Sequence, residues 1–312
     1  MQKQSMKWVV IMVVVIILFV FSLIAAGIVS LFFIADETGK TGIGNVALIP
    51  VKGVIMAEKG SGFFGESIVS STDINSFIED AGKDSSIKAI IFEIDSPGGS
   101  AVASEEIANA IKKVNKTTVA LIRESGTSGA YWIASATDYI IANRMSITGS
   151  IGVISSYLDF SGLLQDYNVT YERLVAGDYK DIGTPLKKMT NAEREIFQSK
   201  IGKIHEFFID EVAKNRNLPK EKVKEISTGL FYIGSEAKEL GLVDELGGKE
   251  EAVNYLEKKL NTTIEIVEYV KNPSLLDILS GVFDEKSFFV GKGIGSAFFE
   301  KSRTASKVEV WA

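Results

Sequence analysis

The segment from Ile87 to Ile94 (IKAIIFEI) limits the possible folds most strongly, because it is almost continuously apolar. A run of this kind is expected of a strand buried on both faces of a parallel sheet. A helical pattern follows from about Ser104 to Asn115, and two further strand-like runs lie at Thr118–Ile122 and Tyr139–Ala142. Alternation of strands and helices at these spacings predicts an α/β layered core with parallel strands and flanking helices.

Two glycine-rich turns follow the first two of these strands. One is Asp95–Ser100 (DSPGGS), and the other lies within Glu124–Ala134 (ESGTSGAYWIA). Ligands bind at the carboxyl ends of the strands in such sheets, so we expect both turns to face one pocket. Ser128 lies where a strand gives way to a helix, and the free N–H groups there can hold the oxyanion that forms when a serine attacks a carbonyl. The simpler interpretation of Ser128 is turn and N-cap chemistry.

The composition restricts which base could activate a serine. The chain has no cysteine and one histidine, His205, which lies in a long helical pattern far from any glycine-rich turn. We interpret His205 as a helix surface or groove residue rather than as part of a Ser-His-Asp triad, and we expect neither a metal site nor a cofactor. A net charge of −6, without a cluster of basic and aromatic residues, argues against nucleic acid as a partner.

The remaining bases are lysine, aspartate and glutamate, and Lys180 lies in an aperiodic loop, Ala176–Pro185 (AGDYKDIGTP). A lysine with its ordinary pKa of about 10.4 is protonated at neutral pH, but burial in an apolar pocket lowers that pKa. The simpler interpretation is a solvated loop lysine. A carboxylate paired with the amine would keep it charged, so we expect Asp181 to point away from Lys180.

An uncharged, apolar run of about 27 residues spans Trp8–Ile34, which exceeds the roughly 20 residues that a membrane-spanning helix needs. Lys3 and Lys7 precede it, and Asp36 and Glu37 follow. The positive-inside rule then predicts a single-pass anchor with a cytoplasmic N-terminus and an extracytoplasmic location for everything after Asp36. A cleaved signal peptide is the alternative, although its apolar region is usually shorter. The predicted divisions are 1–7 (cytoplasmic), 8–34 (anchor), 35–44 (linker), 45–271 (α/β domain) and 272–312 (Phe/Gly-rich tail).

The rest of the chain predicts further helices and strands. Thr190 and Glu193 form a capping-box pattern at the start of a long helix that ends near Asn215. The other expected helices are 71–81, 158–167, 220–226, 235–240 and 249–260, and the other expected strands are 45–56, 169–175 and 262–270.

Five short motifs, in order behind the apolar segment, resemble the signal peptide peptidase A family of membrane-anchored serine proteases. That family has the Clp protease and crotonase type of fold, and the resemblance covers roughly Val46–Gly248. The motifs are Asp95–Gly99, Thr127–Trp132, Thr148–Val153, Tyr179–Pro185 and Gly241–Asp244.

The resemblance implies a Ser-Lys dyad in which Ser128 is the nucleophile and Lys180 the general base. Ser150 matches a family serine that hydrogen-bonds the lysine. Whether the dyad forms within one chain or across an interface stays open. The backbone N–H groups implied for the oxyanion hole are those of Gly129 and of Gly99 or Gly98.

The resemblance also implies the substrates and the assembly. They are remnant signal peptides and other apolar or unfolded peptides at the extracytoplasmic face, and a ring- or dome-shaped homo-oligomer. Three alternatives remain: cleavage of a specific stomatin-like partner, a catalytically silent peptide-binding scaffold, and acyl-coenzyme A chemistry. The predicted anchor and orientation disfavour the last one.

Overall fold

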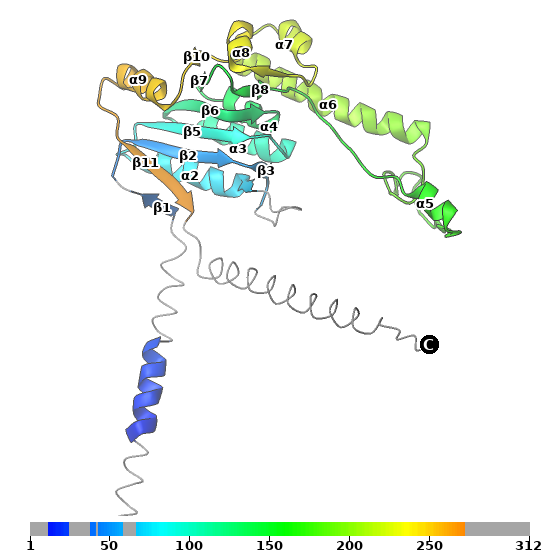
Figure 1. Cartoon of the computed structure of the whole chain (residues 1–312), viewed down its shortest axis with the longest axis horizontal. Helices are drawn as coiled ribbons and strands as arrows, with labels where there is room; N and C mark the ends of the chain where they lie inside the picture. Colours follow the sequence, from blue (N-terminus) through cyan, green and yellow to red (C-terminus); the bar gives the residue numbers. More distant parts are fainter. Residues whose placement is uncertain (1–11, 25–37, 42, 59–66, 272–312) are drawn as a thin grey trace, which may run out of the picture. The chain divides into compact units, whose positions relative to one another are not determined.

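The structure is a computed structural model that describes residues 12–24, 38–41, 43–58 and 67–271 (Figure 1). Contacts divide the chain into two units, Lys40–Val270 and Met1–Gly39 with Lys271–Ala312. Residues 12–24 are helical. Among the described residues, none of the helices combines the length and the apolarity needed to cross a bilayer. The predicted anchor at 8–34 extends past these residues at both ends, and the predicted tail at 272–312 lies outside the described residues.

A parallel sheet forms the centre of the Lys40–Val270 unit, as the sequence predicts. Its strands run in the order β11-β2-β5-β6-β7-β10, and each neighbouring pair is parallel. β5 is buried on both faces along nearly its whole length, which explains its continuous apolar sequence. The bounds are β2 (Val46–Lys52), β5 (Ala89–Ser96), β6 (Thr117–Thr127), β7 (Tyr139–Ala142), β10 (Glu245–Leu246) and β11 (Ile266–Lys271), with β1 (Thr38–Thr41) before them.

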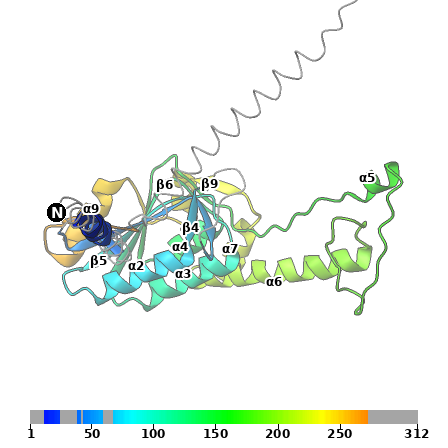
Figure 2. The same cartoon turned by 90° about the horizontal axis from the view of Figure 1, so that it is seen from below.

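Helices cover the sheet unequally on its two faces. Alternate residues of β2, β5 and β6 point into a large core with the helices α2, α3, α4 and α6, and the intervening residues pack against α9. Figure 2 shows α2, α3 and α6 side by side along one face of the sheet. The bounds are α2 (Ser71–Lys83), α3 (Ala101–Lys113), α4 (Gly129–Ser135), α6 (Asn191–Arg216) and α9 (Lys249–Leu260).

β6 is longer than the sequence suggests, because it changes its neighbour along its length. We expected this strand to end at Ile122, where its pairing with β7 stops. It continues to Thr127 because Ser125–Thr127 pairs with a different strand, β8, which in turn pairs antiparallel with β9. The remaining elements are β3 (Val54–Met56), β4 (Ile68–Ser70), β8 (Ile147–Gly149), β9 (Phe231–Ile233), α7 (Lys220–Ile226) and α8 (Gly234–Leu240).

Residues 153–190, called the arm below, lead away from the sheet in both views (Figures 1 and 2). The arm holds one short helix, α5 (Ser161–Asp166), and none of its residues, all of which are described, is buried. The strand predicted at 169–175 is wrong, because the arm offers these residues no neighbouring strand to pair with. α6 begins at the end of the arm, so only its later part, including Phe208 and Val212, is buried in the core.

Candidate functional site

Ser128 lies between the end of β6 and the start of α4 in a conformation that non-glycine residues rarely adopt. Its φ is 54° and its ψ is −125°. Such a conformation costs on the order of 1–3 kcal/mol and persists only when its surroundings hold it. The Ser128 N–H donates to the carbonyl of Gly149 at 2.8 Å, and the Ser128 carbonyl accepts from the Trp132 N–H at 3.0 Å. The backbone is therefore fixed on both sides of this serine.

The Gly98–Gly99 turn packs against Ser128 so closely that side chains do not fit. Gly98 has a φ of 96°, and a Cβ there would lie 2.8 Å from the backbone nitrogen of Gly129. A Cβ on Gly99 would lie 2.1 Å from the carbonyl oxygen of Ile55. Ile55 also donates its N–H to the Gly98 carbonyl at 2.9 Å, so β3 holds the turn beside Ser128.

The N–H groups around Ser128 differ in whether they already have an acceptor. The Gly98 N–H donates to the Ser96 hydroxyl at 3.1 Å. In the described part of the chain, the N–H groups of Gly99 and Gly129 have no acceptor. They are neighbours, because a Cβ on Gly129 would lie 3.4 Å from the Gly99 nitrogen. Of the two predicted alternatives, Gly99 is therefore better suited than Gly98 to bind an oxyanion together with Gly129.

Ser128, Gly99, Gly129 and Ser150 all line one cavity of about 830 Å³, called the serine cavity below. Ser150 also has a positive φ, of 50°. Its hydroxyl donates to the Gly229 carbonyl at 3.0 Å, which leaves the oxygen lone pairs free to accept from an amine. The other residues that line the serine cavity are Pro97, Ser100, Ala101, Trp132, Gly152, Val153, Ile154, Ile204, His205, Phe208, Ser227, Thr228 and Gly229.

Lys180 is not among the residues that line the serine cavity. It lies on the arm and is exposed, and the arm leads away from α4 (Figure 1). The carboxylate of Asp181 accepts from Arg173 at 2.6 and 2.8 Å and lies 3.8 Å from the Lys187 amine. The Arg173 hydrogen bonds lower the pKa of Asp181. Asp181 is therefore engaged away from Lys180, as expected, and a single chain does not bring Lys180 to Ser128.

His205 lies on a helix at the edge of a groove, as the sequence interpretation has it, but the sequence did not show that this groove is the serine cavity. It is far from the glycine-rich turns along the sequence, yet α6 brings it to the wall of the serine cavity. Its neighbour one turn on, Phe208, stacks on Trp132 with ring centroids 4.7 Å apart. Within the described residues, His205 makes no hydrogen bond to Ser128 or to a carboxylate, so a Ser-His-Asp triad has no support. The spacing of Ile204, His205 and Phe208 on one helix was the signal that could have located it.

Two aspartates of the sequence motifs have structural roles. Asp95 accepts from the Ser125 N–H at 3.1 Å and thus organises the ends of β5 and β6. Asp244, in the Gly241–Asp244 motif, accepts from the Ile140 N–H at 2.8 Å and from two nitrogens of Arg216 at 3.0 and 2.6 Å. The motif therefore ties the end of α6 to β7.

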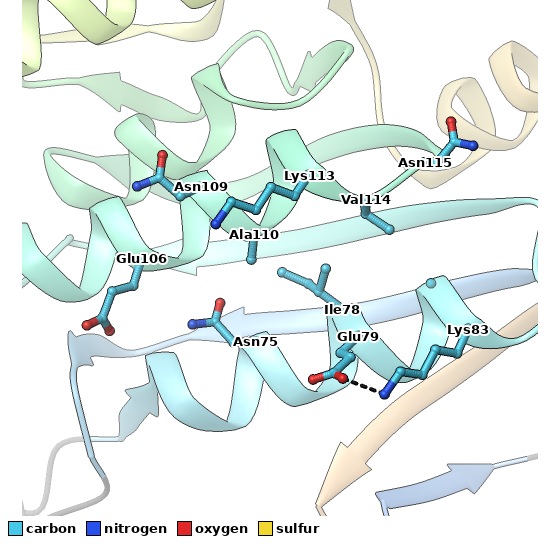
Figure 3. Close-up of a pocket in the computed structure, with 11 residues that line it drawn as sticks. Asn75, Ile78, Glu79, Lys83, Glu106, Asn109, Ala110, Lys113, Val114 and Asn115 are labelled. Atoms are coloured by element: carbon cyan, nitrogen blue, oxygen red, sulfur yellow. Dashed lines mark hydrogen bonds and ion pairs between the residues drawn. The ribbon is translucent and has the colours of Figure 1, made fainter.

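A second cavity, of about 620 Å³, lies between α2 and α3 (Figure 3). Asn75, Glu106 and Lys113 contribute polar groups to it, and Glu79 pairs with Lys83 within α2. None of its lining residues carries a hydroxyl or thiol. It therefore contains no serine-type nucleophile, and the serine cavity remains the candidate active site.

Several known proteins similar to this chain are named as proteases. Residues 110–263 match peptidase family S49. The protein named "Putative protease MJ0651" of Methanocaldococcus jannaschii is 34% identical over 257 residues, which cover 81% of each chain. The "Putative signal peptide peptidase SppA" of Enterococcus faecium is 34% identical over 243 residues, 76% of this chain and 70% of that protein. A mutant ClpP1 from Listeria monocytogenes, 15% identical, matches with a TM-score of 0.44 over 65% of this chain and 92% of its own.

These similarities define a class of enzyme, the serine peptidases. The chain belongs to peptidase family S49, the family of signal peptide peptidase SppA and protease 4.

Proposed function

We propose that this chain is a membrane-anchored endopeptidase in which Ser128 and Lys180 form the catalytic dyad on a Clp protease-like core. The observation that carries the proposal is the fixed, positive-φ backbone of Ser128 beside the unpaired N–H groups of Gly99 and Gly129. This arrangement supplies a nucleophile and two donors for the oxyanion. α4 has only seven residues, so these two N–H groups rather than the helix dipole carry the stabilisation.

Lys180 reaches the site, in this proposal, from a second copy of the chain. The arm that carries Lys180 exposes many large apolar side chains, and exposed apolar surface of this extent marks an interaction site. Leu174 is 96% exposed, Ile154 is 92% exposed and Tyr167 is 75% exposed. A neighbouring copy that covers the arm would bury these side chains and bring the amine into the serine cavity. The same packing repeated around an axis gives a closed ring.

The reaction follows from the three groups thus assembled. The Ser128 Oγ attacks the peptide carbonyl while the uncharged Lys180 amine takes its proton, and that proton passes to the leaving amine as the peptide bond breaks. Water then hydrolyses the ester with Lys180 again as base. Removal of the lysine from water favours its uncharged form, and the Ser150 hydroxyl oxygen can accept a hydrogen bond from the amine.

The family and the apolar N-terminal segment support a proposal for the substrates and the location. We propose that residues 8–34 anchor the chain with its N-terminus in the cytoplasm, so that the catalytic domain works outside the cytoplasmic membrane. A relative bears the name signal peptide peptidase, which supports remnant signal peptides and other apolar or unfolded peptides as substrates.

Variants at the two dyad positions test the proposal. Ser128→Ala and Lys180→Ala should each lose peptidase activity by about 10⁴-fold or more, because nucleophile and base act as a unit. A serine-reactive fluorophosphonate or β-lactone should label the wild-type chain at Ser128 and should not label Ser128→Ala. Peptide cleavage by Ser128→Ala would overturn the assignment of the nucleophile.

Co-assembly of the two inactive variants tests the supply of Lys180 by a neighbour. In an equal mixture, about a quarter of the sites combine an intact serine with an intact lysine from the adjacent copy, so activity should return to roughly that level. Co-expressed variants that remain inactive, in assemblies of wild-type size, would show that the dyad forms within one chain.

A further inference from the structure

Ser104, on α3, has a completely buried hydroxyl close to the two N–H groups that can hold the oxyanion. The residue has no exposed surface, and its Oγ donates to the Ser100 carbonyl at 2.9 Å. Ser100 directly follows Gly99 in the chain, so this bond acts on the turn that carries the first of these N–H groups. The reaction proposed for Ser128 gives the Ser104 hydroxyl no role.

The same oxygen lies against Gly129, the residue that carries the second N–H group. A Cβ on Gly129 would lie only 2.3 Å from the Ser104 Oγ, which is closer than side chains approach each other. The oxygen is therefore in van der Waals contact with the Gly129 Cα. The next atoms that this Cβ would meet are the Ser104 Cβ at 3.2 Å and the Gly99 nitrogen at 3.4 Å. One hydroxyl thus links the segments that carry the two donors.

The hydrogen bond of this hydroxyl does little for the stability of the fold. The Ser100 carbonyl also accepts from the Ser104 N–H at 3.0 Å, so it stays paired when the hydroxyl is removed. A helix serine that donates to the carbonyl four residues earlier tends to destabilise its helix slightly. Stability of α3 therefore gives no reason for a hydroxyl at this position.

We propose that Ser104 is a positioning residue of the oxyanion hole, whose hydroxyl sets the separation between the N–H groups of Gly99 and Gly129. It binds the segment that follows Gly99 and limits how closely Gly129 approaches α3. Donors stabilise an oxyanion best when they are in place before the reaction, and a small displacement slows the reaction greatly. Ser104 does not line the serine cavity, so it acts only through these two groups. The inference rests on the proposed function, in which Ser128 is the nucleophile.

The variant Ser104→Ala of the full-length chain tests the role of the hydroxyl. Peptide cleavage should show a kcat that is lower by about tenfold or more and a KM that is nearly unchanged, because the oxyanion forms only on the way to the transition state. The rate of fluorophosphonate labelling at Ser128 should fall by a similar factor, since the phosphoryl oxygen of the probe occupies the same position. The midpoint of urea unfolding should stay close to that of the wild type.

Ser135→Ala is the matched control. Ser135 is also completely buried, and it donates to a helix carbonyl, that of Trp132, at 2.7 Å. It lies at the opposite end of α4 from Gly129. Its hydroxyl also accepts from Asn215 at 3.1 Å, so the control loses more hydrogen bonds than Ser104→Ala. Its kcat and labelling rate should nevertheless remain those of the wild type.

A second pair of variants tests the contact with Gly129. Gly129 is the first residue of α4, where the helix itself tolerates alanine. The methyl group of Gly129→Ala would lie 2.3 Å from the Ser104 Oγ, so kcat should fall by about a hundredfold or more. Ser104→Gly combined with Gly129→Ala removes this obstacle and should be at least about tenfold more active than Gly129→Ala alone, because substitutions of residues in contact are not additive.

Three results would overturn the inference. The first is a Ser104→Ala chain with the kcat and the labelling rate of the wild type. The second is a loss in Ser135→Ala as large as in Ser104→Ala. The third is a double variant no more active than Gly129→Ala. If Ser104→Ala is unfolded by circular dichroism, Ser104→Cys decides instead, because its larger sulfur presses on Gly129 and should lower kcat, and a wild-type kcat would overturn the inference. Cleavage by Ser128→Ala would refute the proposed function separately, whatever the effect of Ser104.

Discussion

The Lys40–Val270 unit without its arm, called the body below, buries its large apolar side chains, whereas the arm exposes them. In the body, strand residues such as Ile90 and Phe92 and helix residues such as Ile107 are completely buried. In the arm, Leu174 and Ile154 are almost completely exposed. Burial of apolar area stabilises a fold by roughly 25 cal/mol per Å², so the body holds itself together and the arm gains little from its own side chains.

This difference separates what one chain can do from what it leaves for a partner. The body fixes Ser128, both candidate oxyanion donors and Ser150 around one cavity. The arm carries Lys180 and a surface suited to another protein surface. In our proposal the nucleophile therefore depends on folding of the chain, and the base depends on association of chains.

Truncation of one aliphatic side chain in each region gives the largest expected contrast. Ile107→Ala in α3 should lower the free energy of unfolding by about 2–5 kcal/mol, because it leaves a cavity in the core. Leu174→Ala in the arm should change it by no more than about 0.5 kcal/mol, while it weakens self-association. Urea unfolding measures the first effect and sedimentation velocity the second. A Leu174→Ala chain that is as destabilised as Ile107→Ala would contradict the comparison.

The next contrast uses two arginine–aspartate pairs, one in the body and one in the arm. The Arg216 side chain is 8% exposed and binds Asp244 through two nitrogens, so Arg216→Ala should cost about 2–4 kcal/mol of unfolding free energy, because it leaves the Asp244 carboxylate without its cation. The Arg173 side chain is 37% exposed and binds Asp181 in the same bidentate way.

Arg173→Ala should therefore leave the unfolding free energy nearly unchanged, since exposed ion pairs contribute little. It should reduce kcat, because Arg173 also donates to the Asp178 carbonyl at 2.9 Å and thereby holds the loop around Lys180. Thermal unfolding and peptide cleavage by both variants separate these effects. Equal destabilisation by Arg173→Ala and Arg216→Ala would mean that the arm packs as firmly as the body.

Sequence reasoning succeeded where local pattern decides the structure. The continuous apolar run at 87–94 identified β5, and the capping box of Thr190 and Glu193 marked the start of α6. The strand-to-helix turn at Ser128 was likewise predicted from the strand-like run before it and the small-residue helical run after it, whereas the nucleophile role of Ser128 came from the family resemblance. These features depend on residues close together in the sequence.

Sequence reasoning failed where contacts between segments far apart in the chain determine the structure. The end of β6 depends on pairing with β8, and the cavity position of His205 depends on the path of α6 across the body. The segment 169–175 has strand-like residues without a partner strand. The separation of Lys180 from Ser128 in one chain was equally hidden, because loop length alone does not fix the direction of the arm.

The smallest contrast concerns two glutamates that cap helices, Glu193 at the junction of arm and body and Glu251 in the body. Glu251 accepts from the Gly248 N–H at 2.6 Å, which lowers its pKa. Glu193 accepts from Lys187 and from the N–H and hydroxyl of Thr190, which lowers its pKa to about 2.

A carboxylate with a lowered pKa stabilises the fold above its ordinary pKa of about 4.3, and this contribution is lost as the pH falls through the lowered value. Backbone N–H groups alone lower the pKa of Glu251, whereas Glu193 is also held by the Lys187 amine. The start of α9 should therefore loosen first on acidification, and the start of α6 only nearer pH 2. Hydrogen exchange at each helix start, corrected for the intrinsic rate, measures this order. The substitutions Glu193→Gln and Glu251→Gln should each abolish the acid dependence at their own helix alone, and loosening of α6 before α9 would contradict the assigned role of Lys187.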